Sequence, residues 1–517
     1  MWRDFFILTM YLFLGIGSLQ AEGFFLWEDC IWVGLERNAQ FRLEKTKSEL
    51  FPILLSEKWK QYLPKLGVHY FGIFSRNREQ LDQEYRDVRI QIQQLLYDGG
   101  EIEREKQKIE IKQLIQLEEK KILREKIFQN ISLAYLNANK RTLIQSMVDH
   151  RYDRYQLENR KRNLEIQTNL LQAVEAKSLK QWEVDFYSKR IHTQALRESS
   201  LLELKAAMFL DPSESLELEP GITERIEIFQ PTPSPIEVDA NHPLRKKNRY
   251  QMELVHLEEE SLRNDWKPKL VLGGYLGRNG NQGFPLQNEI YGVSIGFQAN
   301  LGGSSFVSNT QNGMQSEGNG IQRIPGYGPQ AVGPGENAFQ SGSINLFDEV
   351  SRDKKRYDVR FNLVQSHTER EQTELYLRNL SKSTEIKLEE EYQKYTLYLH
   401  FLRSAFLPLK QKAEEKKLNQ ITEIEYLKTE EEVFVAFEHT FDHYFNYIAI
   451  ALELVILLGE DPFSNRYYHL HRHKYKSEFN QLLSDWKEQI PIQNFEKKEP
   501  RKGKLTPFYL EDPYEMR

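Results

Sequence analysis

Three histidines near the C-terminal end, His469, His471 and His473, alternate along the chain. In an extended segment alternating side chains share one face, so these imidazoles could together bind a metal ion. Arg472 and Lys474 lie between and beside them, and no carboxylate is close in the sequence, which makes a weak metal site. We therefore expect residues 463–517 to form a solvated tail without a bound metal.

The rest of the chain shows no catalytic motif. Residues 302–305 lack the Gly-x-Gly-x-x-Gly spacing of a phosphate-binding loop, and no serine or cysteine nucleophile motif is present. The one cysteine, Cys30, cannot form an intrachain disulfide, and we expect it to be structural. With 70 basic against 76 acidic residues, a broad basic surface is not expected. The sequence thus predicts a protein that is not an enzyme, with no cofactor and no nucleic-acid partner.

The chain carries one pattern twice. Residues 59–100 and 266–303 each contain Trp-Lys, a proline, an apolar strand, a polar loop, a second strand and Gly-Gly. A second echo relates residues 201–212 to residues 451–462. The sequence is therefore an internal duplication.

Each copy predicts one β-hairpin between helices too long for an ordinary globular domain. The hairpins are expected at about 65–97 and 268–301, and the long helices at about 100–209 and 347–459. Four strands cannot bury their own edges, so the chain must share them with other copies. The expected fold class is mainly α with a small β part, built from long antiparallel coiled-coil helices in two homologous halves. The expected domains are a first repeat at 22–212, a proline-rich linker at 213–240, a second repeat at 241–462 and the tail at 463–517.

A segment rich in Gly, Ser, Asn and Gln, at 304–343, has no counterpart in the first half. It offers little apolar surface to offset its ordering entropy, so we expect a disordered or loosely ordered insertion. The Leu-Phe-Asp that follows it at 346–348 resembles the Leu-Tyr-Asp at 96–98. The end of the second hairpin therefore lies either before the insertion or beyond it.

The second strand of each hairpin alternates apolar and polar residues with a period of two, as a membrane β-strand does. The residues expected to face lipid are Val88, Ile90, Ile92, Tyr291, Val293, Ile295 and Phe297. Those expected to face an aqueous lumen are Arg89, Gln91, Gln93, Ser294, Gln298 and Asn300. A half-buried sheet packed on helices in a soluble domain would show the same alternation and remains an alternative.

The N-terminus predicts a secretory signal peptide at 1–21. Arg3 precedes an apolar run at 5–17, and Ala21 supplies the small residue of a cleavage site. The run is too short for a membrane-spanning helix, which needs about 20 residues. A buried first helix of a cytosolic protein is the alternative interpretation.

Four ordered motifs between residues 26 and 462 give the chain a family resemblance. They are Leu-Trp-Glu-Asp with Glu-Arg-Asn at 26–38, Leu-Leu-Tyr-Asp-Gly-Gly at 95–100, Asp-Trp-Lys-Pro-Lys-Leu at 265–270 and a Leu-rich stretch ending in Gly at 452–459. Each motif alone is weak, but their order and the duplication make the set more specific. In these features the chain resembles the TolC-like outer-membrane efflux proteins.

The resemblance implies a homotrimer with a twelve-stranded transmembrane β-barrel in outer-membrane lipid and a periplasmic α-barrel. It also implies docking to a periplasmic adaptor and an inner-membrane pump, as the outer-membrane channel of a tripartite efflux or type I secretion system. We expect a passive conduit that opens at its periplasmic helical tips. A secreted periplasmic coiled-coil scaffold or adaptor without a membrane barrel is the alternative function.

The helical tips are expected near 163–168 and 419–423, where the two halves show similar sequences. Exposed tip residues would contact the adaptor, and we name Leu164, Ile166, Thr168, Ile421 and Thr422. Just past the second tip, Glu423 and Glu425 could form an acidic constriction that binds cations. Solvated glutamates on a helix face are the alternative.

Overall fold

The computed structural model describes residues 24–75, 83–167, 173–219, 221–231, 238–280, 285–301, 303–317, 320–324, 328–347, 351–418 and 420–488. The chain divides into two compact units, and each takes residues from both halves of the duplication. The helical unit comprises Met1–Arg42, Ile122–His242 and Tyr376–Arg517, and the sheet unit comprises Leu43–Lys121 and Pro243–Leu375. The repeats therefore do not coincide with the structural units.

The helical unit is built mainly from long helices. It contains the C-terminal parts of α4 (Glu101–Gln167) and α7 (Arg352–Lys417), and also α2 (Trp27–Arg37), α5 (Ala173–Ala207), η1 (Ile222–Glu224), β3 (Ile226–Ile228), α8 (Glu423–Leu458), β10 (Tyr468–Leu470) and α9 (Glu478–Glu488). Helix α8 has buried residues along its whole length. Among the described residues it is the one helix long and apolar enough to cross a membrane, but 56% of its most apolar stretch is buried inside the chain. Packing in the core thus accounts for its apolar composition.

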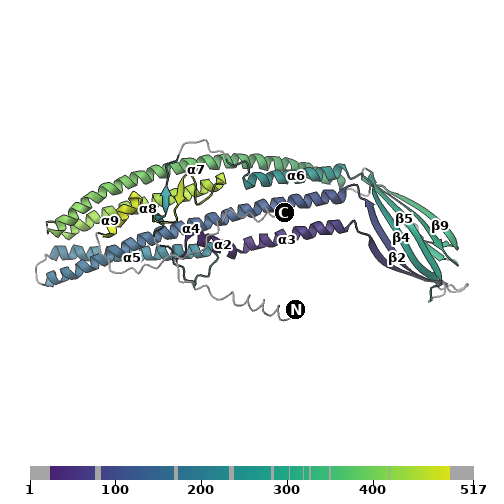
Figure 1. The fold of residues 1–517 in the computed structure, drawn as a ribbon, viewed down its shortest axis with the longest axis horizontal. Coiled ribbons are helices and arrows are strands. Elements are labelled where there is room, and N and C mark those ends of the chain that lie inside the picture. The colour runs from purple at the N-terminus through teal and green to yellow at the C-terminus, as the bar shows by residue number, and fades with distance from the viewer. Residues whose placement is uncertain are drawn as a thin grey trace. The chain divides into compact units, whose positions relative to one another are not determined.

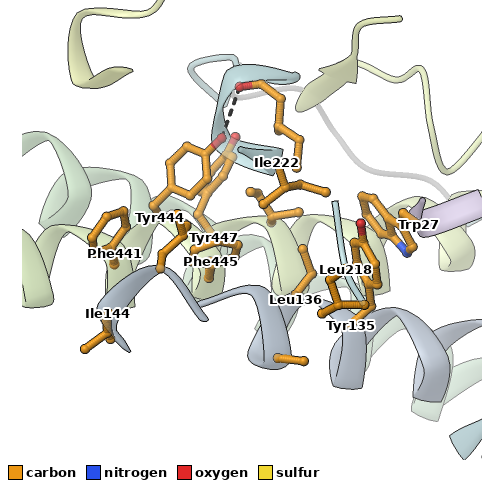
Figure 2. Close-up of a cluster of buried hydrophobic side chains, with 14 of the residues drawn as sticks. Trp27, Tyr135, Leu136, Ile144, Leu218, Ile222, Phe441, Tyr444, Phe445 and Tyr447 are labelled. Carbon is orange, nitrogen blue, oxygen red and sulfur yellow. Dashed lines mark hydrogen bonds between the residues drawn. The ribbon is translucent and has the colours of Figure 1, made fainter. Parts of the chain in front are cut away.

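Aromatic side chains fill much of this core, as Figure 2 shows. Trp27 of α2 stacks on Tyr135 of α4 with ring centroids 6.1 Å apart, and its Nε1 donates a hydrogen bond to Ser132 Oγ at 2.9 Å. On α8, the Tyr444 hydroxyl donates to the Ile226 carbonyl at 3.1 Å. Buried tyrosines thus pack their rings in the core while their hydroxyl groups satisfy the backbone around β3.

The segment after residue 462 is packed, and the prediction of a solvated tail is wrong for its described part. Strand β10 pairs antiparallel with β3. In α9, Phe479, Leu483 and Trp486 are buried, and the Phe479 ring contacts the Phe441 ring at 5.2 Å. Apolar residues spaced three or four apart give this helix one core-facing stripe. Residues 489–517 lie outside the described part of the chain.

The sheet unit combines antiparallel strands with helices. Its elements are most of α3 (Ala39–Lys60), α6 (Pro243–Arg263), the N-terminal parts of α4 and α7, and the strands β1 (Lys65–Ser75), β2 (Gln83–Tyr97), β4 (Lys269–Gly280), β5 (Asn288–Leu301), β6 (Ser304–Gln315), β7 (Gly320–Ile324), β8 (Gly328–Val332) and β9 (Gly335–Asn345). The strand order is β1-β2-β4-β5-β6-β9, and all neighbours are antiparallel (Figure 1). Strands β7 and β8 form a separate pair. Pairing of β2 with β4 joins the hairpins of the two halves.

The described part of the Gly-rich segment consists mainly of β-strands, which corrects the expectation of a loosely ordered insertion. It supplies β6, β7, β8 and β9, so the main sheet has six strands where the sequence predicted four. A backbone ladder with β5, rather than burial of apolar side chains, explains how this polar segment can form strands. Strand β9 ends at Asn345, and Leu346 and Phe347 follow it before α7 begins at Arg352. Of the two positions left open for the end of the second hairpin, the structure therefore shows the one beyond the insertion.

The Asp-Gly-Gly at 98–100 ends β2 and begins α4. Asp98 accepts hydrogen bonds from the backbone N–H of Gly100 at 2.9 Å and of Ile102 at 2.5 Å, so its carboxylate caps the helix. Gly99 and Gly100 have φ of 71° and 78°, which favours glycine. A Cβ at Gly99 would also lie only 2.9 Å from the Cβ of Lys267. The Asp98 cap and the backbone conformation of the two glycines therefore explain why Asp-Gly-Gly stands between β2 and α4.

Candidate functional site

Large apolar side chains gather on one face of β1, β2, β4 and β5. The strand register aligns Val68, Ile90, Leu276 and Tyr291 in one row across these strands. We call this set the apolar band, and its members are Leu66, Val68, Tyr70, Phe74, Val88, Ile90, Ile92, Leu272, Leu276, Tyr291, Val293, Ile295 and Phe297. Most of these side chains are exposed, and Val293 is 58% exposed. A continuous uncovered apolar surface marks a site for lipid or another protein.

The seven residues expected to face lipid all lie in the apolar band. Val88 and Phe297 are half-buried, and the other five are exposed. The soluble alternative would require a layer of helices over this face, but the exposed side chains show no such cover within the described chain.

The opposite face of the sheet carries polar groups joined by hydrogen bonds. Asp87 Oδ2 accepts from Arg89 Nε at 2.6 Å and from the Tyr85 hydroxyl at 3.3 Å. Asn279 Nδ2 donates to Tyr85 Oη at 3.2 Å, and the Arg89 guanidinium lies 5.1 Å from the Tyr275 ring centre. We call these five residues the polar cluster. They link β2 to β4 by side-chain contacts in addition to the backbone ladder.

The polar cluster changes the role expected of Arg89. This residue faces away from the apolar band, as the alternation required, but its charge is neutralised by the buried Asp87. It is thus a paired cation rather than an isolated one. Sequence reasoning missed Tyr85, Asp87 and Asn279, although Asp87 stands two residues from Arg89 and therefore on the same face of β2.

The other five residues expected at the lumen lie on this same face. Gln93 and Gln298 are exposed, while Gln91, Ser294 and Asn300 are half-buried. Asn300 Nδ2 donates a hydrogen bond to Asp265 Oδ1 at 3.1 Å. The face opposite the apolar band is therefore mainly polar, although Phe71, Val271 and Ile290 also lie on it.

Glu423 and Glu425, expected at a constriction, have structural roles in this chain. Glu423 is only 2% exposed, and one of its carboxylate oxygens lies 2.6 Å from Lys416 Nζ. Glu425 accepts a hydrogen bond from the Thr422 backbone N–H at 3.2 Å, while Thr422 Oγ1 accepts from Glu425 N at 3.3 Å. This reciprocal pair is a capping box at the start of α8. The arrangement corrects the assignment of Glu423 as an open acidic group and gives Glu425 a capping role.

The residues expected at the helical tips are only partly placed. Leu164 and Ile166 lie near the C-terminal end of α4, and Thr168 lies outside the described residues. Ile421 is half-buried against the core of the helical unit, and Thr422 is the exposed N-cap of α8. Adaptor contact by these residues remains a prediction.

Close to the start of α8, the helical unit holds a buried group of charges that the sequence did not reveal. Arg154 of α4 forms an ion pair with Glu430 of α8 and donates to the Tyr426 hydroxyl at 3.0 Å. Arg151 of α4 pairs with Glu431 at 2.7 Å. Lys189 of α5 also contacts Glu431, at 3.2 Å. We call Arg151, Arg154, Lys189, Glu430 and Glu431 the ion cluster.

Burial makes the ion cluster sensitive to the loss of any partner. Arg151 is 1% exposed and Glu430 is fully buried. Burial alone would raise the pKa of Glu431, but Arg151 and Lys189 outweigh that effect and lower it. Helices α4 and α8 are therefore held together by charges with little access to water, and α5 joins them through the partly exposed pair of Lys189 and Glu431.

The histidines near the C-terminal end differ in their contacts. His471 Nε2 lies 2.8 Å from Glu227 Oε2, and His469 Nδ1 lies 3.0 Å from Ser464 Oγ. His473 is exposed. Across the described residues no group of three or more His, Cys, Asp or Glu side chains is arranged to hold a metal ion.

Comparisons with known proteins give the fold. No family model and no curated protein matches the sequence. Among solved structures, the outer membrane channel CmeC of Campylobacter jejuni has a TM-score of 0.61 at 10% identity, covering 90% of this chain and 90% of that chain. The outer membrane channel MtrE of Neisseria gonorrhoeae, in its open state, has a TM-score of 0.61 at 12% identity, covering 84% of this chain and 89% of that chain. CusC, which forms a transmembrane channel, has a TM-score of 0.60 at 11% identity, covering 86% of this chain and 96% of that chain. The chain has the fold of the TolC-like outer-membrane efflux channels, as its sequence predicted.

Proposed function

We propose that this protein is a non-enzymatic outer-membrane channel that extends into the periplasm. The observation that carries the proposal is the sheet, with an exposed apolar band on one face and hydrogen-bonded polar side chains on the other. Closed barrels present apolar residues to lipid and polar residues to an aqueous lumen. The fold shared with outer-membrane channels supports the same conclusion.

The proposed channel is a homotrimer. An open sheet in a membrane leaves unpaired backbone groups at its edges, and closure with other copies removes those edges. Four band-carrying strands from each of three chains would give a twelve-stranded barrel, which is large enough for an aqueous path. Lumen-facing Gln93 and Gln298 would then be among the side chains that line this path.

In this proposal the chain is a passive conduit, and its partners are a periplasmic adaptor and an inner-membrane pump. The signal peptide expected at 1–21 would direct export, and the helical tips would meet the adaptor. Opening would require α8 to move relative to α4 and α5, and the ion cluster would have to rearrange with that motion. Neither drug, metal ion nor protein is singled out as cargo by the lumen-facing side chains.

The deciding experiment is single-channel recording with the purified full chain in a planar lipid bilayer. We expect discrete conductance steps, and we expect the protein to fractionate with outer membranes as a detergent-dependent trimer. Heat-denatured protein from the same preparation serves as the control. A monomer that stays soluble without detergent and carries no current would contradict the channel and favour the periplasmic scaffold.

A further inference from the structure

We propose that the hairpin formed by β6 and β9 is a removable cover on the edge of β5, which a second copy of this chain displaces during assembly. The inference rests on the proposed trimeric barrel and goes beyond it. It identifies the β5 edge, occupied within the single chain, as the surface on which β1 of the neighbouring copy pairs.

The hairpin covers β5 along most of its length. Paired residues run from Ile290 opposite Gln315 to Leu301 opposite Ser304. Only Gly302 and Gly303 separate the two strands, and Gly303 has a φ of 100°, which a tight turn of this kind favours. The edges of the main sheet in the described chain are therefore β1 and β9, while β5 lies inside the sheet.

Between Val293 and Phe297 the apolar band ends where the hairpin begins, although Phe306, Met314 and Ile344 lie on the band side nearer the two ends of the hairpin. Thr310 continues the row of Ile295, and Gln340 of β9 continues it further. Asn312 similarly continues the row of Val293. At the depth of Val293–Phe297 the hairpin presents, on the band side, Ser308, Thr310, Asn312, Ala338, Gln340 and Gly342. Amides at this depth would lie in hydrocarbon without water to bond.

The other face of the hairpin is also mainly polar. It carries Asn309, Gln311, Asn337, Ser341 and Ser343 together with Val307 and Phe339. The four strands β1, β2, β4 and β5 each have one apolar and one more polar face, but at the depth of Val293–Phe297 the hairpin has no comparable apolar face. A barrel wall that kept the hairpin would interrupt the apolar band once in every subunit.

Strand direction allows β1 of a second copy to replace the hairpin. Successive neighbours from β1 to β5 are antiparallel, so β1 of another copy would also run antiparallel to β5. One antiparallel ladder would then replace another of similar length, at little cost in backbone hydrogen bonds. The apolar band would become continuous around the barrel, which favours the exchange.

The hairpin is held on β5 by a backbone ladder of twelve residue pairs, and side chains add contacts near its two ends. The Phe297 and Phe306 rings meet edge to face with centroids 5.9 Å apart, and the Tyr291 hydroxyl lies 2.6 Å from Met314 Sδ. Ser316 Oγ accepts a hydrogen bond from Glu289 N at 2.9 Å, and Ser316 N donates to the Glu289 carbonyl at 3.0 Å. A cover held mainly by its backbone ladder can be exchanged for another strand.

Cysteine pairs that lock the cover test the proposal. In a Cys30→Ser background, Ser294→Cys with Gln311→Cys and Ile295→Cys with Thr310→Cys join β5 to β6 at two successive positions. One of these is a non-hydrogen-bonded pair, whose side chains lie closer and suit a disulfide. The control pair Thr310→Cys with Gln340→Cys, and its neighbour Gln311→Cys with Phe339→Cys, join β6 to β9 and leave the hairpin free to move.

Monomers in detergent are oxidised, the disulfide is verified by mass spectrometry, and trimer yield is measured by native mass spectrometry. We expect the β5–β6 lock to reduce trimer yield at least tenfold, with recovery on reduction, while the β6–β9 control assembles like the parent. Trimers that form normally with the β5–β6 disulfide intact would overturn the cover and place the hairpin in the wall.

Two further readouts separate the possible failures. A parent that stays monomeric in detergent and in lipid vesicles refutes the proposed channel, and the cover falls with it. Phe306→Ala loosens the cover without a cross-link, so trimers should form roughly 2- to 10-fold faster, from the strength of an aromatic pair. Unchanged or slower assembly of Phe306→Ala would count against displacement of the hairpin.

Discussion

The two units of this chain place apolar and charged residues in opposite ways. In the helical unit, aromatic rings and even the charges of Arg151 and Glu430 are buried. In the sheet unit, Val293 and its neighbours in the apolar band are exposed, while Asp87 and Asn279 are buried on the other face. The helical unit buries its apolar side chains in a core, whereas the sheet unit exposes a continuous apolar face, as the lipid-facing surface of the proposed channel would require. The same substitution should therefore act differently in the two units.

The largest effect is expected from Glu430→Ala in the ion cluster. The substitution removes the carboxylate that contacts Arg154 and Arg151, while both guanidinium groups stay buried. This should lower the free energy of unfolding of the helical unit by about 3–5 kcal/mol. Chemical denaturation followed by circular dichroism in detergent measures the change. Glu432→Ala, an exposed site on the same helix, is the matched control and should stay within about 0.5 kcal/mol of the parent. Equal stabilities for the two variants would show that the ion cluster does not hold α4 to α8.

A charge in the apolar band should damage membrane insertion more than folding in detergent. Val293→Arg would place a guanidinium on the lipid face of the proposed barrel, at a cost of about 2–4 kcal/mol near the bilayer midplane. Folding into lipid vesicles, compared with folding in detergent, measures this difference. Gln298→Arg, on the opposite face of the same strand, should insert like the parent. Equal insertion of both variants would contradict the assignment of the two faces.

Acid should weaken the packing of α9 through His150. Burial, together with the nearby Arg154 and Lys487, lowers the pKa of this imidazole from 6.5 to about 4, although Glu430 acts in the opposite direction. The folded chain therefore keeps His150 neutral while the unfolded chain gains a proton below pH 6.5, so stability is full above that pH and falls toward pH 4. The loss from this group is about 2–3 kcal/mol.

Thermal unfolding between pH 7.5 and pH 4.5 tests this dependence. His150→Gln removes the titrating imidazole and should therefore flatten the change in Tm over that range. The carboxylates of the chain still titrate in both proteins, so some change remains. The Trp486 ring lies 5.4 Å from His150, so its fluorescence reports on the same contact. An unchanged pH profile in the variant would assign the acid sensitivity to other groups.

Much of the sheet unit could be predicted because its period-two pattern is local. The alternation around Ile90 and Ile295 gave the faces of β2 and β5, since successive side chains of a strand point to opposite sides. That β6 and β9 form strands could not be predicted in the same way. Their polar side chains give no such pattern, and β6 is held by backbone hydrogen bonds to β5. The mostly helical fold with a small antiparallel sheet was correctly predicted.

The helical unit gave fewer local clues. Glu423 looked like an exposed acidic residue, but Lys416 across the turn between α7 and α8 pairs with it in a buried position. The ion cluster joins residues far apart in sequence, such as Arg154 and Glu430, and no spacing rule connects them. The segment after residue 462 does carry a local signal, the apolar spacing of Phe479, Leu483 and Trp486, but its contact with Phe441 of α8 joins residues far apart in sequence.

The two Gly-Gly junctions of the duplication give the smallest and most local prediction. After β2, Asp98 precedes the glycines and caps α4, whereas after β5 Leu301 precedes them and the chain turns into β6. Asp98→Ala removes the cap and should destabilise the first turn of α4 by about 1 kcal/mol, whereas Asp98→Asn keeps an acceptor and should lose less. Amide hydrogen exchange at residues 100–104 measures this. If exchange there is the same in Asp98→Ala and the parent, the glycines and not the carboxylate decide that a helix begins.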